Sequence, residues 1–172
     1  GGVGKTTLMK KIEREYQKTS HFKVIWVAVS RTVDMDMIQE IIMRNLNLTF
    51  NKHDAPYIRA DKINNALWRN KVALMFDDIW EYLDLEELGI LGQKELDTGS
   101  FKLIFTTRSK AVCDEMHSDE LINVQPLGWD DSWALFKESV GSKNDIESCE
   151  SSIVEISKDI ARECKGFPLA LK

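Results

Sequence analysis

The stretch GGVGKTT, at residues 1–7, decides how the rest of the chain is interpreted. It supplies the last six positions of the phosphate-loop pattern G-x-x-x-x-G-K-[ST] and one residue beyond it. Several backbone N–H groups must reach phosphate oxygens at once, so the loop needs residues without a Cβ atom and a helix directly afterwards. In this pattern Lys5 lies against the β- and γ-phosphates, and the Thr6 hydroxyl is a ligand of Mg²⁺. The residues predicted to bind the phosphates are Gly1, Gly2, Val3, Gly4, Lys5, Thr6 and Thr7.

After the loop, helical patterns alternate with apolar runs that are typical of buried strands. Helices are predicted near residues 8–16, 38–46, 63–70 and 109–116, the last with Ser109 as its N-cap, and strands at 24–29, 72–76, 101–105 and 121–124. Residues 48–59 are polar and indicate an exposed connection, and residues 81–95 form a second, acidic loop. This alternation predicts a mainly parallel sheet with helices on both faces.

The pattern changes to helices alone after Pro126. One helix is predicted from Asp130 to Val140, and another carries an apolar stripe from Ile153 to Cys164 and ends at Gly166, its C′ residue. We therefore predict a nucleotide-binding subdomain at residues 1–126 and the start of a helical subdomain at residues 127–172.

The composition is that of a globular domain, and the sequence contains no strongly basic stretch. The chain has 172 residues, 43% of them apolar, and 23 Lys and Arg against 28 Asp and Glu give a net charge of −5. This balance argues against nucleic acid or an anionic membrane as a direct partner. No run of apolar residues is long enough for a transmembrane segment. Three cysteines and three histidines show no zinc-ligand spacing, and reduced thiols in the cytosol are the simplest interpretation.

Two acidic residues end the apolar run at 72–76. Asp77 stands where a carboxylate can hold Mg²⁺ directly or through water, and Asp78 beside it can orient or deprotonate an attacking water. The alternative is an acidic turn without chemistry. Together with Lys5 and Thr6, the pair predicts a magnesium nucleotide site.

Arg108 follows the next apolar run in the sequence Thr106-Thr107-Arg108. A guanidinium there can contact the γ-phosphate and so distinguish ATP from ADP, because only the triphosphate offers charge at that position. The alternative is an ordinary surface arginine after a strand.

The ordered motifs resemble those of the NB-ARC domain of plant NLR disease-resistance proteins. The matching stretches are GGVGKTT, HFKVIWVAVSR, LMFDDIW, FKLIFTTRSKAVC, INVQPLGWDDSWALF and GFPLALK, which together cover the chain. Trp80, which closes the aspartate motif, is the family's usual mark of the coiled-coil class as against the TIR class.

The resemblance implies a role for each matching residue. Thr6 and Asp77 hold the metal, Asp78 is the candidate catalytic carboxylate, Arg108 is the γ-phosphate sensor, and Pro168 contacts the nucleotide from the helical subdomain. The implied fold is an α/β phosphate-loop NTPase of the STAND/NB-ARC type. Its sheet here lacks the first strand, which lies between the strands at 101–105 and 121–124 and leads into the phosphate loop, and the start of the first helical ARC subdomain follows it.

The implied function is a regulatory switch with ADP/ATP and Mg²⁺ as cofactors, and at most a slow ATPase. ADP holds the closed immune receptor, exchange for ATP opens it, and hydrolysis resets it. The expected partners are the receptor's own coiled-coil and leucine-rich-repeat domains and, after activation, other protomers. The expected location is the cytoplasm, with the inner face of the plasma membrane as an alternative. Two other functions stay open: a multiple-turnover ATPase or small-molecule kinase, and an interaction module with a vestigial site.

Overall fold

A computed structural model describes residues 1–19, 21–90, 101–141 and 146–172, which form two compact units. Residues 8–121 make one unit, and residues 122–172 with 1–7 make the other. The elements are α1 (Lys5–Thr19), β1 (Lys23–Ala28), α2 (Met35–Asn45), α3 (Pro56–Arg69), β2 (Val72–Ile79), β3 (Phe101–Thr107), α4 (Lys110–Glu115), α5 (Trp129–Val140), the short helix η1 (Ile146–Ser148) and α6 (Ser151–Glu163). The boundary at residues 121/122 lies slightly before the predicted one, and the predicted subdomain division stays a prediction.

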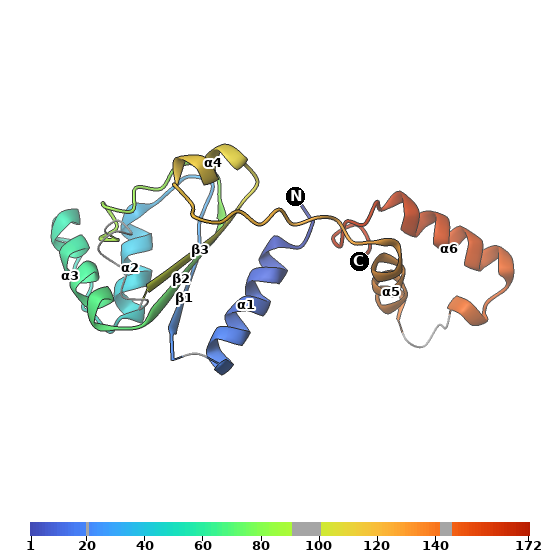
Figure 1. The fold of residues 1–172 in the computed structure, drawn as a ribbon, viewed down its shortest axis with the longest axis horizontal. Helices are drawn as coiled ribbons and strands as arrows, with labels where there is room; N and C mark the ends of the chain where they lie inside the picture. Colours follow the sequence, from blue (N-terminus) through green and yellow to red (C-terminus); the bar gives the residue numbers. More distant parts are fainter. Residues whose placement is uncertain (20, 91–100, 142–145) are drawn as a thin grey trace. The chain divides into compact units, whose positions relative to one another are not determined.

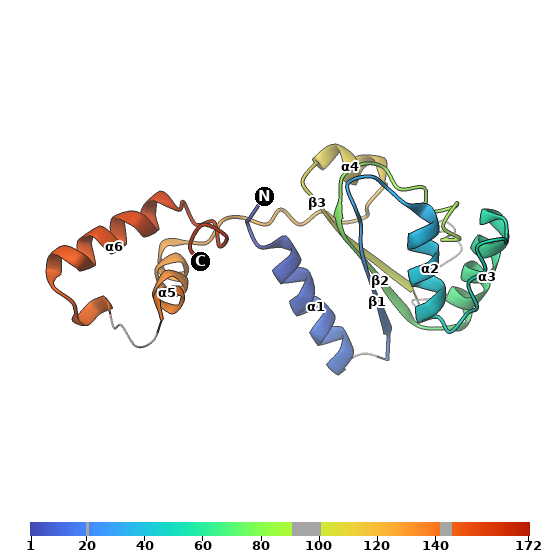
Figure 2. The same cartoon turned by 180° about the vertical axis from the view of Figure 1, so that it is seen from behind.

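The first unit is built on a three-stranded parallel sheet with the order β1-β2-β3. Residues 72–76 of β2 are buried on both faces, as the uninterrupted apolar run predicts. In both views the strands lie between residues 8–19 of α1 on one side and the pair α2 and α3 on the other (Figures 1 and 2). The predicted parallel α/β sheet is therefore confirmed, and its carboxyl edge carries Asp77 and Arg108.

The strand predicted at residues 121–124 is wrong. The described sheet has three strands, and these residues have no regular secondary structure. A strand needs a neighbour to accept and donate its backbone hydrogen bonds. The described sheet places no strand beside residues 121–124 to act as that neighbour, and Leu121 and Ile122 are exposed.

The interpretation of residues 48–59 as an exposed connection is wrong at its end. Helix α3 begins at Pro56, and the Arg59 side chain is buried, with 1% of its surface exposed. Its guanidinium donates to Gln39 Oε1 at 2.7 Å and to the carbonyl of Asp54 at 3.1 Å, and it pairs with Asp36. Two of these partners lie on α2 and one lies in the connection itself. Because most of the contacts come from another helix, the sequence around Arg59 does not indicate that its side chain is buried.

In the helical unit, α5 packs against α6 around Trp133. The rings of Trp129 and Phe136, on the same helix, each stack against the ring of Trp133. The predicted apolar stripe of α6 is present but points to water: Ile153, Ile156 and Ile160 are each about half exposed. Ser109 does precede α4 at the N-cap position, although its side chain makes no capping hydrogen bond. Of the acidic loop predicted at 81–95, residues 91–95 lie outside the described residues.

Candidate functional site

The phosphate loop has the backbone conformation that its glycines predict. Gly2 and Gly4 have φ angles of 81° and 104°, which residues with a Cβ atom rarely adopt. Helix α1 begins immediately afterwards at Lys5, so its first N–H groups and its positive dipole end lie at the loop. A loop followed at once by a helix N-terminus is suited to bind phosphate oxygens through backbone N–H groups.

Pro168 lies against this loop within the same unit. A Cβ atom added at Gly4 would lie 3.8 Å from Pro168 Cγ, and one added at Gly2 would lie 3.1 Å from Leu169 Cβ. The N–H of Leu169 also donates to the carbonyl of Gly2 at 3.3 Å. The structure therefore brings the predicted proline beside the predicted phosphate ligands, and its contact with a nucleotide stays a prediction.

The turn that carries Pro168 depends on Gly166. The C-cap of α6 is Cys164, so the C′ position belongs to Lys165, with φ 51°, and the assignment of C′ to Gly166 is wrong by one residue. Gly166 also has a positive φ of 74°, and a Cβ atom there would lie 2.2 Å from the carbonyl oxygen of Leu127. The Leu127 N–H donates to the Gly166 carbonyl at 2.8 Å, so this close approach fixes the turn that places the proline.

Asp77 and Asp78 form a bulge inside β2. The strand does not stop at Asp77, as the sequence suggested, but runs on to Ile79 with a register shift against β3 between Phe76 and Ile79. Asp78 has a φ of 63°. The Thr106 hydroxyl fixes both acidic residues: it donates to Asp77 Oδ1 at 2.7 Å and accepts from the Asp78 N–H at 2.9 Å. The bulge interrupts the alternation of the strand, which re-aims the two carboxylates.

Arg108 contacts Asp78 from the end of β3. Its Nε donates to Asp78 Oδ1 at 3.0 Å and its Nη2 to Oδ2 at 3.2 Å, which is the two-bond arrangement that a planar guanidinium makes with a carboxylate. Its Cζ also lies 4.6 Å from the centre of the Trp80 ring. The structure thus joins both predicted catalytic residues in one ion pair. The sequence did not lead us to predict the role of Thr106. The one indication was its position two residues before Arg108, at the end of the same strand.

The two residues predicted to hold Mg²⁺ offer the kind of donor atom that this ion prefers. The predicted ligands are the Thr6 hydroxyl and the Asp77 carboxylate, and hard oxygen donors are the ones that Mg²⁺ prefers. Among the described residues no group of three or more His, Cys, Asp or Glu side chains could hold a metal. Mg²⁺ is commonly bound through one or two carboxylates, waters and the phosphates of its nucleotide.

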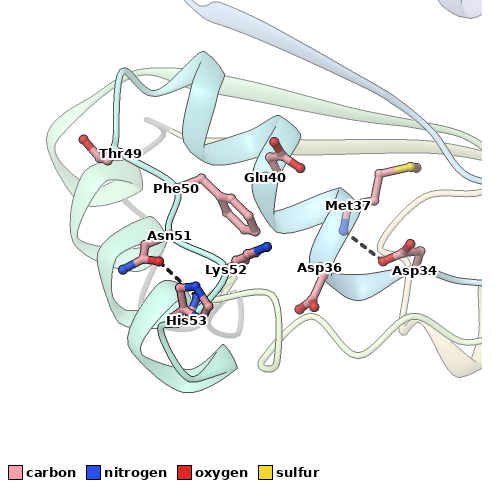
Figure 3. A pocket seen from close by; sticks show the side chains of 9 residues that line it. All are labelled: Asp34, Asp36, Met37, Glu40, Thr49, Phe50, Asn51, Lys52 and His53. Carbon is pink, nitrogen blue, oxygen red and sulfur yellow. Dashed lines mark hydrogen bonds between the residues drawn. The ribbon is translucent and has the colours of Figure 1, made fainter.

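A hollow of about 850 Å³ lies elsewhere in the first unit, at the start of α2 (Figure 3). It is lined by Asp34, Asp36, Met37, Glu40, Thr49, Phe50, Asn51, Lys52 and His53. Its carboxylates already have partners: Asp34 caps the Met37 N–H at 2.9 Å, Asp36 pairs with Arg59, and Glu40 pairs with Arg44. The hollow contains none of the residues that the sequence predicts for phosphate or metal.

Comparison with known proteins agrees with these features. The model of the NB-ARC domain family matches residues 1–146. The chain is 40% identical to three proteins of Arabidopsis thaliana: the probable disease resistance protein At1g61300, disease resistance protein UNI and disease resistance protein RPS5. Each alignment covers 99% of this chain but only 22%, 19% and 19% of the relative, respectively. The chain thus spans about a fifth of the length of these curated relatives.

A solved structure shows the same fold. Cdc6p from Pyrobaculum aerophilum superposes with a TM-score of 0.61 over 99% of this chain and 50% of its own, at 13% identity. The predicted α/β phosphate-loop NTPase fold is therefore confirmed. None of the described helices is both long and apolar enough to cross a membrane. With most of its length matched by the family model, its phosphate loop formed and its acidic pair in place, the chain belongs to the NB-ARC domain family.

Proposed function

We propose that this chain is the ADP/ATP-binding switch module of a plant immune receptor of the coiled-coil class that acts in defence. The printed names of its relatives, disease resistance proteins, support the biological role. The family and the phosphate loop support nucleotide binding. The rest of the receptor is proposed to contain the coiled-coil and leucine-rich-repeat domains that this module regulates. Its place is the cytoplasm, with other protomers as partners after activation.

The observation that carries the proposal is the ion pair between Arg108 and Asp78. The γ-phosphate of ATP carries negative charge that can displace Asp78 from the Arg108 guanidinium or bind beside it. ADP has no phosphate group for this position. A ligand shifts a conformational equilibrium only through such differential contacts. Arg108 therefore makes the site sensitive to which adenine nucleotide is bound.

The same ion pair favours a switch over a fast enzyme. Both oxygens of the Asp78 carboxylate accept hydrogen bonds from Arg108, so the group that would orient the attacking water is engaged by a cation. We expect slow hydrolysis for that reason. A multiple-turnover ATPase or kinase would need this carboxylate to be released in every cycle.

The metal in this proposal is Mg²⁺, held by Thr6 and Asp77. When bound, it neutralises charge on the β- and γ-phosphates. Thr106 orients the Asp77 carboxylate through its hydroxyl, and Lys5 supplies a second positive charge for the phosphates. The chain's own contribution is therefore to bind, to orient the carboxylates and to read the terminal phosphate.

Substitution of Lys5 by Arg in the full-length protein tests the nucleotide site. We expect binding of ADP with Mg²⁺, measured by calorimetry, to weaken strongly, because the longer planar fork does not replace the compact ammonium charge at the phosphates. Wild-type affinity in this variant would contradict the assignment of the phosphate loop. Rapid ATP turnover by the wild-type protein would instead favour the enzyme alternative, and failure to bind any adenine nucleotide would favour a vestigial site.

A further inference from the structure

Trp80 contacts two arginines at the edge of the sheet that carries the acidic pair. Its ring centre lies 4.6 Å from Cζ of Arg108 and 5.0 Å from Cζ of Arg31. Trp80 as a residue is 38% exposed, so burial in the core does not explain its position. All these residues belong to the unit formed by residues 8–121.

The contacts of Arg108 define its orientation. Asp78 takes the N–H groups of Nε and Nη2 along one edge of the guanidinium, and the guanidinium carbon lies over the Trp80 ring. No described residue takes a hydrogen bond from the Nη1 amino group, since the hydrogen bonds of the Arg108 side chain within the described chain all go to Asp78. A guanidinium that is paired along one edge and lies over an aromatic ring loses much of its freedom to reorient, while its remaining N–H groups stay available to an acceptor.

Arg31 reaches the same ring from the other neighbouring strand. The segment after β1 continues beside β2, where the Val29 N–H donates to the carbonyl of Asp77 at 3.0 Å. The two ring distances place the guanidinium carbons of Arg31 and Arg108 within about 10 Å of each other. Arg108 is balanced by Asp78, and the ring contact brings Arg31, as a further cation, to the edge that also carries the Asp77 carboxylate predicted to hold the metal.

We propose that Trp80 is a positioning residue for triphosphate recognition: its ring restricts Arg108 so that the Nη1 edge stays available to the terminal phosphate of ATP, and it keeps Arg31 as a second cation at the same sheet edge. This inference rests on the proposed function, because it assigns to Trp80 a role in the discrimination between ATP and ADP. The sequence motif marks Trp80 as the residue that closes the acidic stretch and as a sign of the coiled-coil class, and it assigns no contact to the side chain.

The test compares two tryptophans of matched exposure in the full-length protein. Trp80 and Trp68 are 38% and 39% exposed, and Trp68 lies on α3, so W68L removes the same surface without touching either arginine of the pair. W80L keeps an apolar side chain but removes the π face, and W80F restores a π face. Affinities for ADP and for a non-hydrolysable ATP analogue, both with Mg²⁺, are measured by calorimetry.

We expect W80L to lower the ratio of ATP-analogue affinity to ADP affinity by about two- to fivefold, since cation–π contacts at exposed sites have about that effect on an equilibrium. The affinity for ADP should stay within about twofold, W80F should retain most of the ratio, and W68L should equal the wild type. A general structural defect would lower both affinities alike.

The outcomes separate this inference from the function on which it rests. If R108A abolishes the nucleotide preference while W80L leaves the ratio at the W68L value, the role of Trp80 is overturned and the switch stands. If R108A leaves the ratio unchanged as well, Arg108 is not the phosphate sensor and the sensor assignment falls with the inference. Should W80L fail to fold by circular dichroism, W80M removes the π face with a larger apolar side chain and is judged by the same ratio.

Discussion

Substitution of Thr106 by Val removes the hydroxyl that fixes the acidic bulge and keeps the size and β-branching of the side chain. The hydroxyl makes two hydrogen bonds, of 2.7 Å to the carboxylate of Asp77 and of 2.9 Å from the N–H of Asp78. Valine has a similar volume and a high preference for strands, so β3 itself should persist. The change therefore isolates the two hydrogen bonds.

The expected loss follows from the nature of the two bonds. A hydrogen bond to a charged group contributes about 1.5–3 kcal/mol and a neutral one about 0.5–1.5 kcal/mol. Thr106 is only partly buried, so water replaces part of both. We expect the free energy of unfolding to fall by about 1–3 kcal/mol. Because the carboxylate of Asp77 loses its orientation, the affinity for nucleotide with Mg²⁺ should fall about tenfold, which corresponds to about 1.4 kcal/mol.

Two variants control this experiment. T107V makes the same change one residue along the strand, where the hydroxyl accepts from the Ser109 N–H at 3.2 Å and touches neither carboxylate. T106S keeps a hydroxyl and should restore most of the affinity. Nucleotide affinity is measured by calorimetry with and without Mg²⁺, and stability by urea denaturation of the full-length protein. Equal behaviour of T106V and T107V would refute the role of Thr106 in orienting the acidic pair.

Three further predictions concern the scaffold and the thiols. G166A should destabilise the helical unit by about 2 kcal/mol or more in thermal denaturation, because its φ is 74° and the new Cβ would lie 2.2 Å from the carbonyl oxygen of Leu127; wild-type stability would contradict the tight turn. R59L should lower the free energy of unfolding by about 2–4 kcal/mol, since it removes the buried donor of several hydrogen bonds, and a change below about 0.5 kcal/mol would argue against the network. Burial raises the pKa of the Cys113 thiol above its ordinary value of 9.0, so iodoacetamide should modify it more slowly than the exposed Cys149. Faster modification of Cys113 than of Cys149, followed by mass spectrometry, would contradict the raised pKa. The protonated thiol is favoured in the folded state, so its contribution to stability is complete below pH 9.0 and is lost as the pH rises through the raised pKa.

The parts that could be predicted from sequence are those determined by local patterns. The uninterrupted apolar run at residues 72–76 indicated a strand buried on both faces, and the glycines followed by Lys5 indicated a loop before a helix. Asp77 and Arg108 could be placed at the same edge of the sheet because parallel strands end there together. Motif order then sufficed to name the family.

The parts that could not be predicted depend on residues far apart in the chain. The bulge at Asp78 is fixed by Thr106, 28 residues later, and no local pattern of two aspartates indicates it. Arg59 lies in a polar stretch, and only its contacts with Gln39 and its neighbours bury it. An apolar run such as residues 121–124 becomes a strand only beside a neighbour, which the run itself cannot supply.

In the proposed function, Arg108 makes the bound nucleotide a switch and not merely a ligand. The most direct test is to measure the adenine nucleotide retained by purified full-length protein, and its turnover, in the wild type and in R108A. We expect the wild type to retain ADP and to exchange it for ATP, with a turnover at least about a hundredfold below the typical enzyme value of about 10 s⁻¹. We expect R108A to lose the discrimination between ATP and ADP. Rapid turnover by the wild type, or an unchanged preference in R108A, would contradict it.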